Sequence, residues 1–229
     1  MRFLCAPYSG ASATVFRPWV ELLPSNIALS AVELPGRGSR FSESPLTCME
    51  DLIDQLYDAV RPHLRMPFVL FGHSLGAVVM FELAHRFVDS HLIPERLIVS
   101  GQRALHRPSP RSPIHNLPDE QFISEINQYG GTQAGIFENE ELRSIFLPLL
   151  RADFQLGETY VPHTTSPLCC DLSAYGGLQD PEVSVADIQA WRRYTEKQFN
   201  YRMFPGNHFF LHQHNGLVVE SLLADLSKE

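Results

Sequence analysis

The sequence predicts an α/β fold with a mostly parallel central sheet flanked by helices and an inserted helical segment. Short apolar runs alternate along the chain with longer segments of helical periodicity, which is the order that parallel βαβ units require. The 229 residues are 44% apolar and 19% charged, and they contain no internal repeat, which fits one globular domain of ordinary composition. We therefore expect a single domain over residues 1–229.

Proline and glycine mark the ends of several predicted elements. Pro7 ends the first apolar run, and Pro35 with Gly36 ends the second. Residues 51–64 carry apolar side chains at four-residue spacing behind an acidic first turn, as in an amphipathic helix. The predicted strands are residues 2–6, 28–34, 68–71, 96–100, 168–175 and 201–204. The predicted helices are residues 51–64, 75–88, 185–194 and 217–226.

The segment between the fourth and fifth predicted strands has a different character. Residues 102–118 are rich in proline and arginine and are expected to form a surface loop. Residues 118–160 show helical periodicity throughout and no strand pattern. We expect residues 118–160 to form a helical lid over the edge of the sheet.

Charge and composition disfavour several classes of partner. The net charge is -8 and the isoelectric point is about 5.7, which disfavours binding to nucleic acid. No run reaches the ~18 apolar residues of a membrane span, and the N-terminus lacks a signal-peptide pattern, so a cytoplasmic protein without a membrane association is expected. The four cysteines, among them Cys5 and the adjacent Cys169 and Cys170, have no zinc-ligand spacing and are expected to be reduced and mostly buried.

The segment Gly72-His73-Ser74-Leu75-Gly76 matches the G-x-S-x-G nucleophile elbow. In this motif a strand turns sharply into a helix and leaves the serine exposed at the apex, with glycines where side chains would collide with backbone. The predicted strand before Gly72 and the predicted helix after Gly76 supply that context. We expect Ser74 to be a nucleophile, with the alternative that the segment is a tight glycine turn with an incidental serine.

A serine nucleophile needs a base and an acid that orients the base. In chain order these are Asp or Glu and then His, in loops after late strands. The two loops that qualify offer Asp180 and His208. The rival acids are Glu182, Asp171 and Asp187, of which the last two are placed inside a predicted strand and a predicted helix. The rival histidines His212 and His214 also raise the possibility of a metal, but no carboxylate stands at ligand spacing, so neither a metal nor another cofactor is expected.

An oxyanion hole is expected from two backbone N–H groups. One belongs to Leu75, the residue after the nucleophile, and the other to the loop after the first strand. Pro7 has no N–H, so Tyr8 is the first free donor in that loop and Ala6 is the alternative.

At these residues the chain resembles a type II thioesterase of nonribosomal peptide and polyketide synthase pathways, a member of the α/β-hydrolase superfamily. The resemblance covers nearly the whole sequence. It differs from the usual family pattern at Ala11 and Asn207, where glycine is more common, and each change adds bulk beside the expected site. The matching segments are residues 6–11, 33–38, 72–77, 150–154, 176–180 and 206–211.

The resemblance implies the α/β-hydrolase fold and hydrolysis of acyl thioesters on the phosphopantetheine arm of acylated carrier-protein domains, by a monomer. It implies that Ser74, Asp180 and His208 form the catalytic triad. A hydrolase of small oxygen esters, a non-catalytic homologue that binds acylated carriers and a transacylase remain as alternatives.

Two further features bear on how a carrier substrate would bind. Apolar lid residues are expected either to line an acyl tunnel or to pack the lid onto the core; these are Phe122, Ile126, Ile145, Phe146 and Leu149. Carrier proteins are typically acidic, as this chain is, so docking requires a local patch. The loop with Arg103, Arg107 and Arg111 is one candidate, and a solvated loop without such a role is the alternative.

Overall fold

The computed structural model describes residues 1–64, 67–130 and 135–227 and contains a parallel six-stranded sheet with strand order β2-β1-β3-β4-β5-β6. This confirms the predicted α/β class. The order reverses at β1 and β3, so the carboxyl ends of these strands flank a crevice, the usual place for a site in such a sheet. The strands are β1 (Arg2–Ala6), β2 (Ala28–Ala31), β3 (Phe68–His73), β4 (Arg96–Ser100), β5 (Asp171–Gly177) and β6 (Phe199–Phe204).

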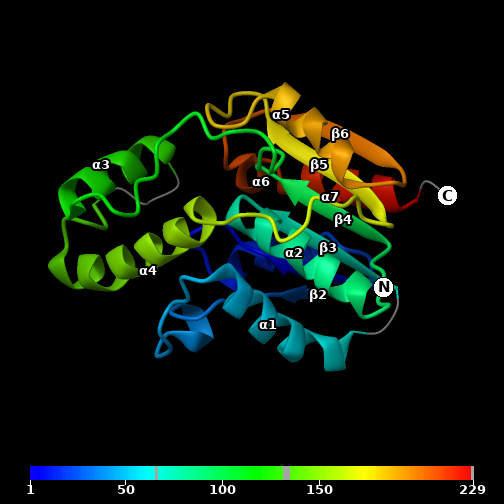
Figure 1. Cartoon of the computed structure of the whole chain (residues 1–229), viewed down its shortest axis with the longest axis horizontal. Helices are drawn as coiled ribbons and strands as arrows, with labels where there is room; N and C mark the ends of the chain where they lie inside the picture. The colour runs from blue at the N-terminus through cyan, green and yellow to red at the C-terminus, as the bar shows by residue number, and fades with distance from the viewer. Residues whose placement is uncertain (65–66, 131–134, 228–229) are drawn as a thin grey trace.

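Helices cover both faces of the sheet (Figure 1). One face carries α1 (Met49–Val60), α2 (Leu75–Asp89) and α5 (Val185–Gln189), whose apolar residues form a large buried cluster with the strands. The other face carries the 3-10 helix η1 (Ala13–Glu21), α6 (Phe210–Gln213) and α7 (Asn215–Leu226), with a second cluster. Because both faces are covered, the central strands are continuously apolar rather than alternating, and every residue of β3 and β4 is buried.

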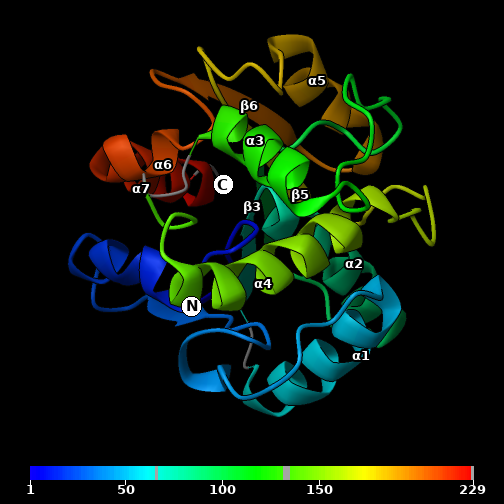
Figure 2. The same ribbon diagram turned by 90° about the vertical axis from the view of Figure 1, so that its left-hand side faces the viewer.

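Two helices are inserted between β4 and β5. They are α3 (Asp119–Tyr129) and α4 (Glu140–Glu158), and they share a small apolar cluster of their own. Figure 1 shows them together at one end of the sheet, and Figure 2, which faces that end, shows α4 crossing in front of the strands. The insertion therefore stands over the edge of the sheet where β3 and β4 end.

Several boundaries differ from the sequence expectation for identifiable reasons. The strand expected over 28–34 ends at Ala31, which pairs with Cys5 of β1. The Val32 N–H still donates to the Cys5 carbonyl, but Pro7, the next residue after β1, has no N–H to continue the ladder. The strand expected from residue 168 begins at Asp171, and Leu168 forms an isolated bridge to Thr195. The helices η1 and α6 were not expected. Cys48 is exposed, which is contrary to the expected burial of most cysteines, whereas Cys5 and Cys170 are buried.

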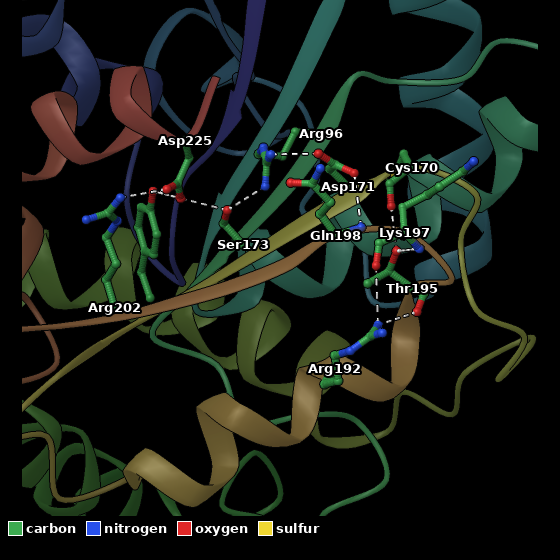
Figure 3. Close-up of polar contacts among 11 residues, drawn as sticks. Arg96, Cys170, Asp171, Ser173, Arg192, Thr195, Lys197, Gln198, Arg202 and Asp225 are labelled. Atoms are coloured by element: carbon green, nitrogen blue, oxygen red, sulfur yellow. Dashed lines mark hydrogen bonds and ion pairs between the residues drawn. The ribbon is translucent and has the colours of Figure 1, made fainter. Parts of the chain in front are cut away.

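A network of polar side chains fastens α7 to the sheet on the face opposite α2 (Figure 3). Asp225 of α7 is 1% exposed and accepts hydrogen bonds from Ser173, Tyr175 and Arg202 at 2.7 Å each. Burial raises the pKa of Asp225, but the hydrogen bonds from Arg202, Ser173 and Tyr175 outweigh it, so the pKa lies below its ordinary value. The ionised carboxylate is therefore the form that stabilises the fold.

We expect Asp225→Asn to lower the free energy of unfolding by about 3 kcal/mol at pH 7, because it leaves Arg202 without its charged partner. A carboxylate with a depressed pKa stabilises the fold above its unfolded pKa, and this contribution disappears as the pH falls through the folded pKa. Urea unfolding at pH 7 and at pH 3 measures both effects. The difference between wild type and variant should shrink at pH 3, and an equal difference at both values would contradict this assignment.

Candidate active site

Ser74 lies at the sharp turn between β3 and α2, where the sequence motif places it. Its backbone has φ +54° and ψ -118°, a conformation that costs a non-glycine residue of order 1–3 kcal/mol. Its N–H donates to the Ser100 carbonyl at 2.8 Å, so the neighbouring strand fixes the turn. The strain is therefore held by the sheet, and it presents the serine at the carboxyl end of β3.

The two glycines of the motif are required by close backbone approach. A Cβ on Gly72 would lie 2.0 Å from the Gly76 carbonyl oxygen, and a Cβ on Gly76 would lie 2.2 Å from the Ala6 carbonyl oxygen. Neither obstacle is a flexible side chain. The start of α2 consequently sits directly against the end of β1, which brings the expected oxyanion-hole residues from these two elements to the same place.

Asp180 and His208 meet across two loops at the same edge of the sheet. Asp180 follows β5 and His208 follows β6, and His208 Nδ1 is 2.8 Å from Asp180 Oδ2. The Asp180 side chain is fully buried, and its other oxygen accepts the Glu182 N–H at 2.8 Å. An ionised carboxylate can only accept, so Nδ1 carries the proton and Nε2 is left as a base.

The rival acids are engaged elsewhere. Asp171 pairs with Arg96 at 2.7 Å, Asp187 caps α5 through Ser184, and Glu182 pairs with Arg111 at 2.6 Å. Among the described residues, Asp180 is the carboxylate that contacts His208. The same part of the chain holds no group of three or more His, Cys, Asp or Glu side chains that could bind a metal.

The other histidines near His208 pack around it. His73 is fully buried, its ring centroid is 5.1 Å from that of His208, and its Nδ1 is 2.9 Å from Ser100 Oγ. Burial holds the pKa of His73 well below its ordinary value, so the ring is neutral. His212 Nε2 is 2.8 Å from the Tyr8 hydroxyl, and burial lowers the pKa of His212 as well. Both histidines therefore contact residues of the loops around the site.

The expected oxyanion donors have free N–H groups. Leu75 is the first residue of α2, so its N–H has no acceptor within the helix. Tyr8 follows Pro7 in the loop after β1, while the alternative donor, Ala6, is the last residue of that strand. Leu75 and Tyr8 both line the cavity that contains Ser74.

A cavity of about 370 Å³ contains both Ser74 and His208. Its apolar lining comes from α2 and from the inserted helices and includes Val78, Leu150 and Phe154. Ala11 and Asn207, which depart from the family pattern, are not among its lining residues, so their added bulk lies outside it.

The expectation of an acyl tunnel lined by lid residues is only partly met. Of the five apolar lid residues considered for it, Ile126 lines the cavity. Phe122 and Leu149 are buried in packing, Phe146 is half-buried and does not line the cavity, and Ile145 is 38% exposed. Leu150 and Phe154, which periodicity does not distinguish from their neighbours, take the lining positions instead.

The three loop arginines lie at the cavity but already have partners. Arg103 donates to the Glu182 carbonyl, Arg107 pairs with Asp187 at 3.0 Å, and Arg111 pairs with Glu182. Arg107 is the most exposed of the three arginines, with 46% of its side chain accessible. Most of the positive charge expected to serve carrier docking is thus neutralised by carboxylates of the same chain.

Two polar residues of the site region escaped the sequence prediction. Arg37, after β2, and Asp153, on α4, form a buried ion pair. Each lies in a segment that carries the family resemblance. Because they are 116 residues apart in the sequence, no local pattern predicts their contact.

Comparison with known proteins identifies the family. A family model described as a thioesterase domain matches residues 2–228. Linear gramicidin dehydrogenase LgrE from Brevibacillus parabrevis is 43% identical over 221 residues, which cover 95% of this chain and 82% of that protein.

Solved structures agree with this match. RedJ, a thioesterase from the prodiginine pathway of Streptomyces coelicolor, superposes with a TM-score of 0.89 and 36% identity, covering 97% of this chain and 89% of that one. YbtT, a type II thioesterase from the yersiniabactin NRPS/PKS pathway, gives 0.88 and 32%, with 97% and 91% covered. Within the described ranges, no helix has the length and apolar character to cross a membrane. The chain therefore belongs to the thioesterase family of α/β-hydrolases, and its relatives include type II thioesterases of nonribosomal peptide and polyketide pathways.

Proposed function

We propose that the protein hydrolyses acyl thioesters from the phosphopantetheine arm of carrier-protein domains through an acyl intermediate on Ser74. The observation that carries this proposal is the strained Ser74 in one cavity with the buried Asp180–His208 pair. Such an arrangement provides a nucleophile, a base and an orienting acid. The family membership favours a thioester over other acyl substrates, and editing or release of stalled acyl groups is the corresponding role in a biosynthetic pathway.

The reaction follows from the positions of these groups. His208 Nε2 takes the proton of the Ser74 hydroxyl while Oγ attacks the thioester carbonyl, and the N–H groups of Tyr8 and Leu75 bind the oxyanion. His208 then gives its proton to the departing pantetheine sulfur. Water, deprotonated by His208, attacks the acyl-Ser74 ester, and His208 returns this proton to Ser74 Oγ as the acid is released. The described contacts include no hydrogen bond from Ser74 to His208, and such bonds commonly tighten only when substrate is bound.

We also propose that residues 118–160 act as a lid within a single domain of residues 1–229. In support, α3 and α4 share a separate apolar cluster and supply Ile126, Leu150 and Phe154 to the cavity wall. Water exclusion by such a wall strengthens the electrostatic stabilisation of the oxyanion. Movement of the lid would admit the long pantetheine arm.

The partner in this proposal is an acylated carrier-protein domain, bound by a monomer. The chain carries a net charge of -8, so global attraction to an acidic carrier is excluded as the docking force. Recognition therefore depends on local contacts around the cavity mouth and on the pantetheine arm itself. Under this proposal, the enzyme distinguishes substrates by the phosphopantetheine arm and the acyl group that it carries.

Comparison of acyl-carrier proteins with nitrophenyl esters tests the proposed substrate. We expect release of the acyl group from a panel of loaded carriers, followed by mass spectrometry, with kcat/KM at least about tenfold higher than for nitrophenyl esters of the same acid, because the arm adds binding that a small ester lacks. The Ser74→Ala variant is the control for uncatalysed thioester hydrolysis. Preference for the small esters without carrier turnover would favour the oxygen-ester hydrolase. Saturable carrier binding without turnover of any ester would favour the non-catalytic homologue.

A further inference from the structure

A buried ion pair joins α4 to the loop that follows β2. Arg37 Nη1 donates to Asp153 Oδ2 at 2.6 Å, and Arg37 Nη2 donates to Oδ1 at 2.7 Å. The two side chains are 5% and 1% exposed. A bidentate ion pair of this kind fixes the relative orientation of the two side chains as well as their distance. Because both side chains are buried, each charge is compensated mainly by the other.

The same two side chains hold the turn that follows β1. In the turn Tyr8–Ala11, the Ala11 N–H donates to the Tyr8 carbonyl at 3.1 Å, and Gly10 has φ +78°, as a type II turn requires at its third position. The Gly10 N–H donates to Asp153 Oδ2 at 2.6 Å, and Arg37 Nη1 donates to the Ala11 carbonyl at 3.3 Å. Each member of the ion pair therefore fixes one peptide group of the turn.

Packing against α4 restricts the backbone of the turn Tyr8–Ala11 and of the loop that follows β2. A Cβ on Gly10 would lie 2.6 Å from Leu150 Cδ2, and a Cβ on Gly36 would lie 3.2 Å from Leu149 Cδ1. These distances mean that the two loop backbones lie directly on consecutive side chains of α4. The ion pair thus sits in a junction of three segments that are far apart in the sequence.

We propose that Arg37 and Asp153 position the oxyanion donor at Tyr8 by fixing this turn against α4. Tyr8 is the first residue of the turn, so a shift of the turn shifts its N–H relative to that of Leu75. Oxyanion stabilisation depends on donors held in place before the reaction, and a misplacement of about 1 Å can lower the rate by about 100-fold. The inference rests on the proposed function and deepens it.

The role assigned to the pair is positioning rather than catalytic. Asp153 borders the cavity, but its two oxygens are occupied by Arg37 and the Gly10 N–H. The pair consequently acts through the turn. It also couples the lid to the chemistry, because displacement of α4 would release the turn, so the enzyme is competent only while α4 is docked.

Two variants and one matched control test this role. Asp153→Asn removes the charge and half of the acceptors, and Arg37→Lys keeps the charge but loses the planar fork. Asp225→Asn is the control, because Asp225 is equally buried at 1% exposed and also binds an arginine, but it lies outside the residues that line the cavity. The readouts are kcat and KM with a short acyl-N-acetylcysteamine thioester and the affinity of a trifluoromethyl ketone analogue, which forms a tetrahedral oxyanion on the serine.

For Asp153→Asn and Arg37→Lys we expect kcat to fall by about 10- to 100-fold, with KM within about threefold of the wild-type value. Affinity for the trifluoromethyl ketone should fall by the same factor as kcat/KM, while affinity for the product acid stays unchanged. Asp225→Asn should keep kcat within about twofold despite its lower stability. The proposal is overturned if the folded variants keep wild-type kcat, lose no more than the control, or raise KM at constant kcat.

Folding and the proposed function are tested separately. If Asp153→Asn does not fold by circular dichroism, Arg37→Lys provides the same comparison. If the wild type hydrolyses no thioester, the positioning role of Arg37 and Asp153 is tested by the rate at which a fluorophosphonate labels Ser74. Phosphonylation also places a negatively charged oxygen in the oxyanion hole. Slower labelling in the variants supports the positioning role even when the thioesterase proposal fails. Equal labelling rates, or no labelling of the wild type, overturn it.

Discussion

Replacement of Ser74 by alanine is expected to lower kcat for acyl-thioester hydrolysis by about 10⁴- to 10⁶-fold. The hydroxyl is the atom that the Asp180–His208 pair would activate in the proposed reaction, in the cavity that Ser74 shares with His208. The remaining activity would come from the oxyanion hole and from binding alone.

The fold should survive this substitution. Alanine at φ +54° carries the same backbone strain as serine, and the Ser74 N–H keeps its hydrogen bond to the Ser100 carbonyl. Ser112→Ala is the matched control, since Ser112 borders the same cavity on the loop before α3. We expect the control to retain kcat within about fivefold, as is usual for a side chain outside the reacting groups. A Ser74→Ala variant with more than about 1% of wild-type kcat would contradict the assignment.

Replacement of Gly76 by alanine is expected to lower kcat by at least about 100-fold. A single methyl group at this position would lie 2.2 Å from the Ala6 carbonyl oxygen and 2.6 Å from that of Pro7. These atoms belong to backbone, so either α2 or the end of β1 must move. Leu75 is the first residue of α2, and Tyr8 lies in the loop after β1. Movement of either element therefore separates the two proposed oxyanion donors.

The control for this variant is Gly157→Ala on α4. Gly157 lies in the last turn of α4 and borders the cavity, and a Cβ there would lie 3.7 Å from Leu75 Cδ1, which is ordinary contact. Alanine in a helix is more favourable than glycine by up to about 1 kcal/mol. We expect Gly157→Ala to keep its activity and to melt at the same or a higher temperature. Steady-state kinetics and thermal unfolding measure both variants. Wild-type kcat in Gly76→Ala would show that the approach of α2 to β1 does not set the rate.

The sequence was sufficient for the parts of the site that lie within one local segment. The elbow at Ser74 could be predicted because its glycines, its strand and its helix are consecutive in the chain. Beyond one local segment, the contact between Asp180 and His208 could also be predicted, because both follow late strands and the carboxyl ends of parallel strands meet at one edge. Two of the rival acids, Asp171 and Asp187, could be set aside because they were expected inside a strand and a helix, and they lie in β5 and α5.

Features that depend on tertiary packing could not be predicted in this way. Periodicity assigns Phe122 and Leu150 to the same apolar class, and only the docking of the lid decides that Leu150 borders the cavity while Phe122 packs in the lid cluster. The pairing of Arg37 with Asp153 depends on how α4 settles on two distant loops. The end of β2 at Ala31 depends on where β1 ends, which no pattern within residues 28–34 contains.

An acyl group on Ser74 is the intermediate that the proposed reaction requires, and mass spectrometry of acid-quenched reactions detects it. Wild-type protein and His208→Ala are mixed with excess acyl-carrier protein, quenched over a time course and digested, and each peptide is searched for the acyl mass. We expect an acyl adduct on the peptide that contains Ser74 in the wild type, and a much slower appearance of that adduct in His208→Ala, because the base that activates Ser74 is missing. Hydrolysis of the carrier thioester at the wild-type rate with no adduct on Ser74 in either protein, or with the adduct on another residue, would contradict this expectation.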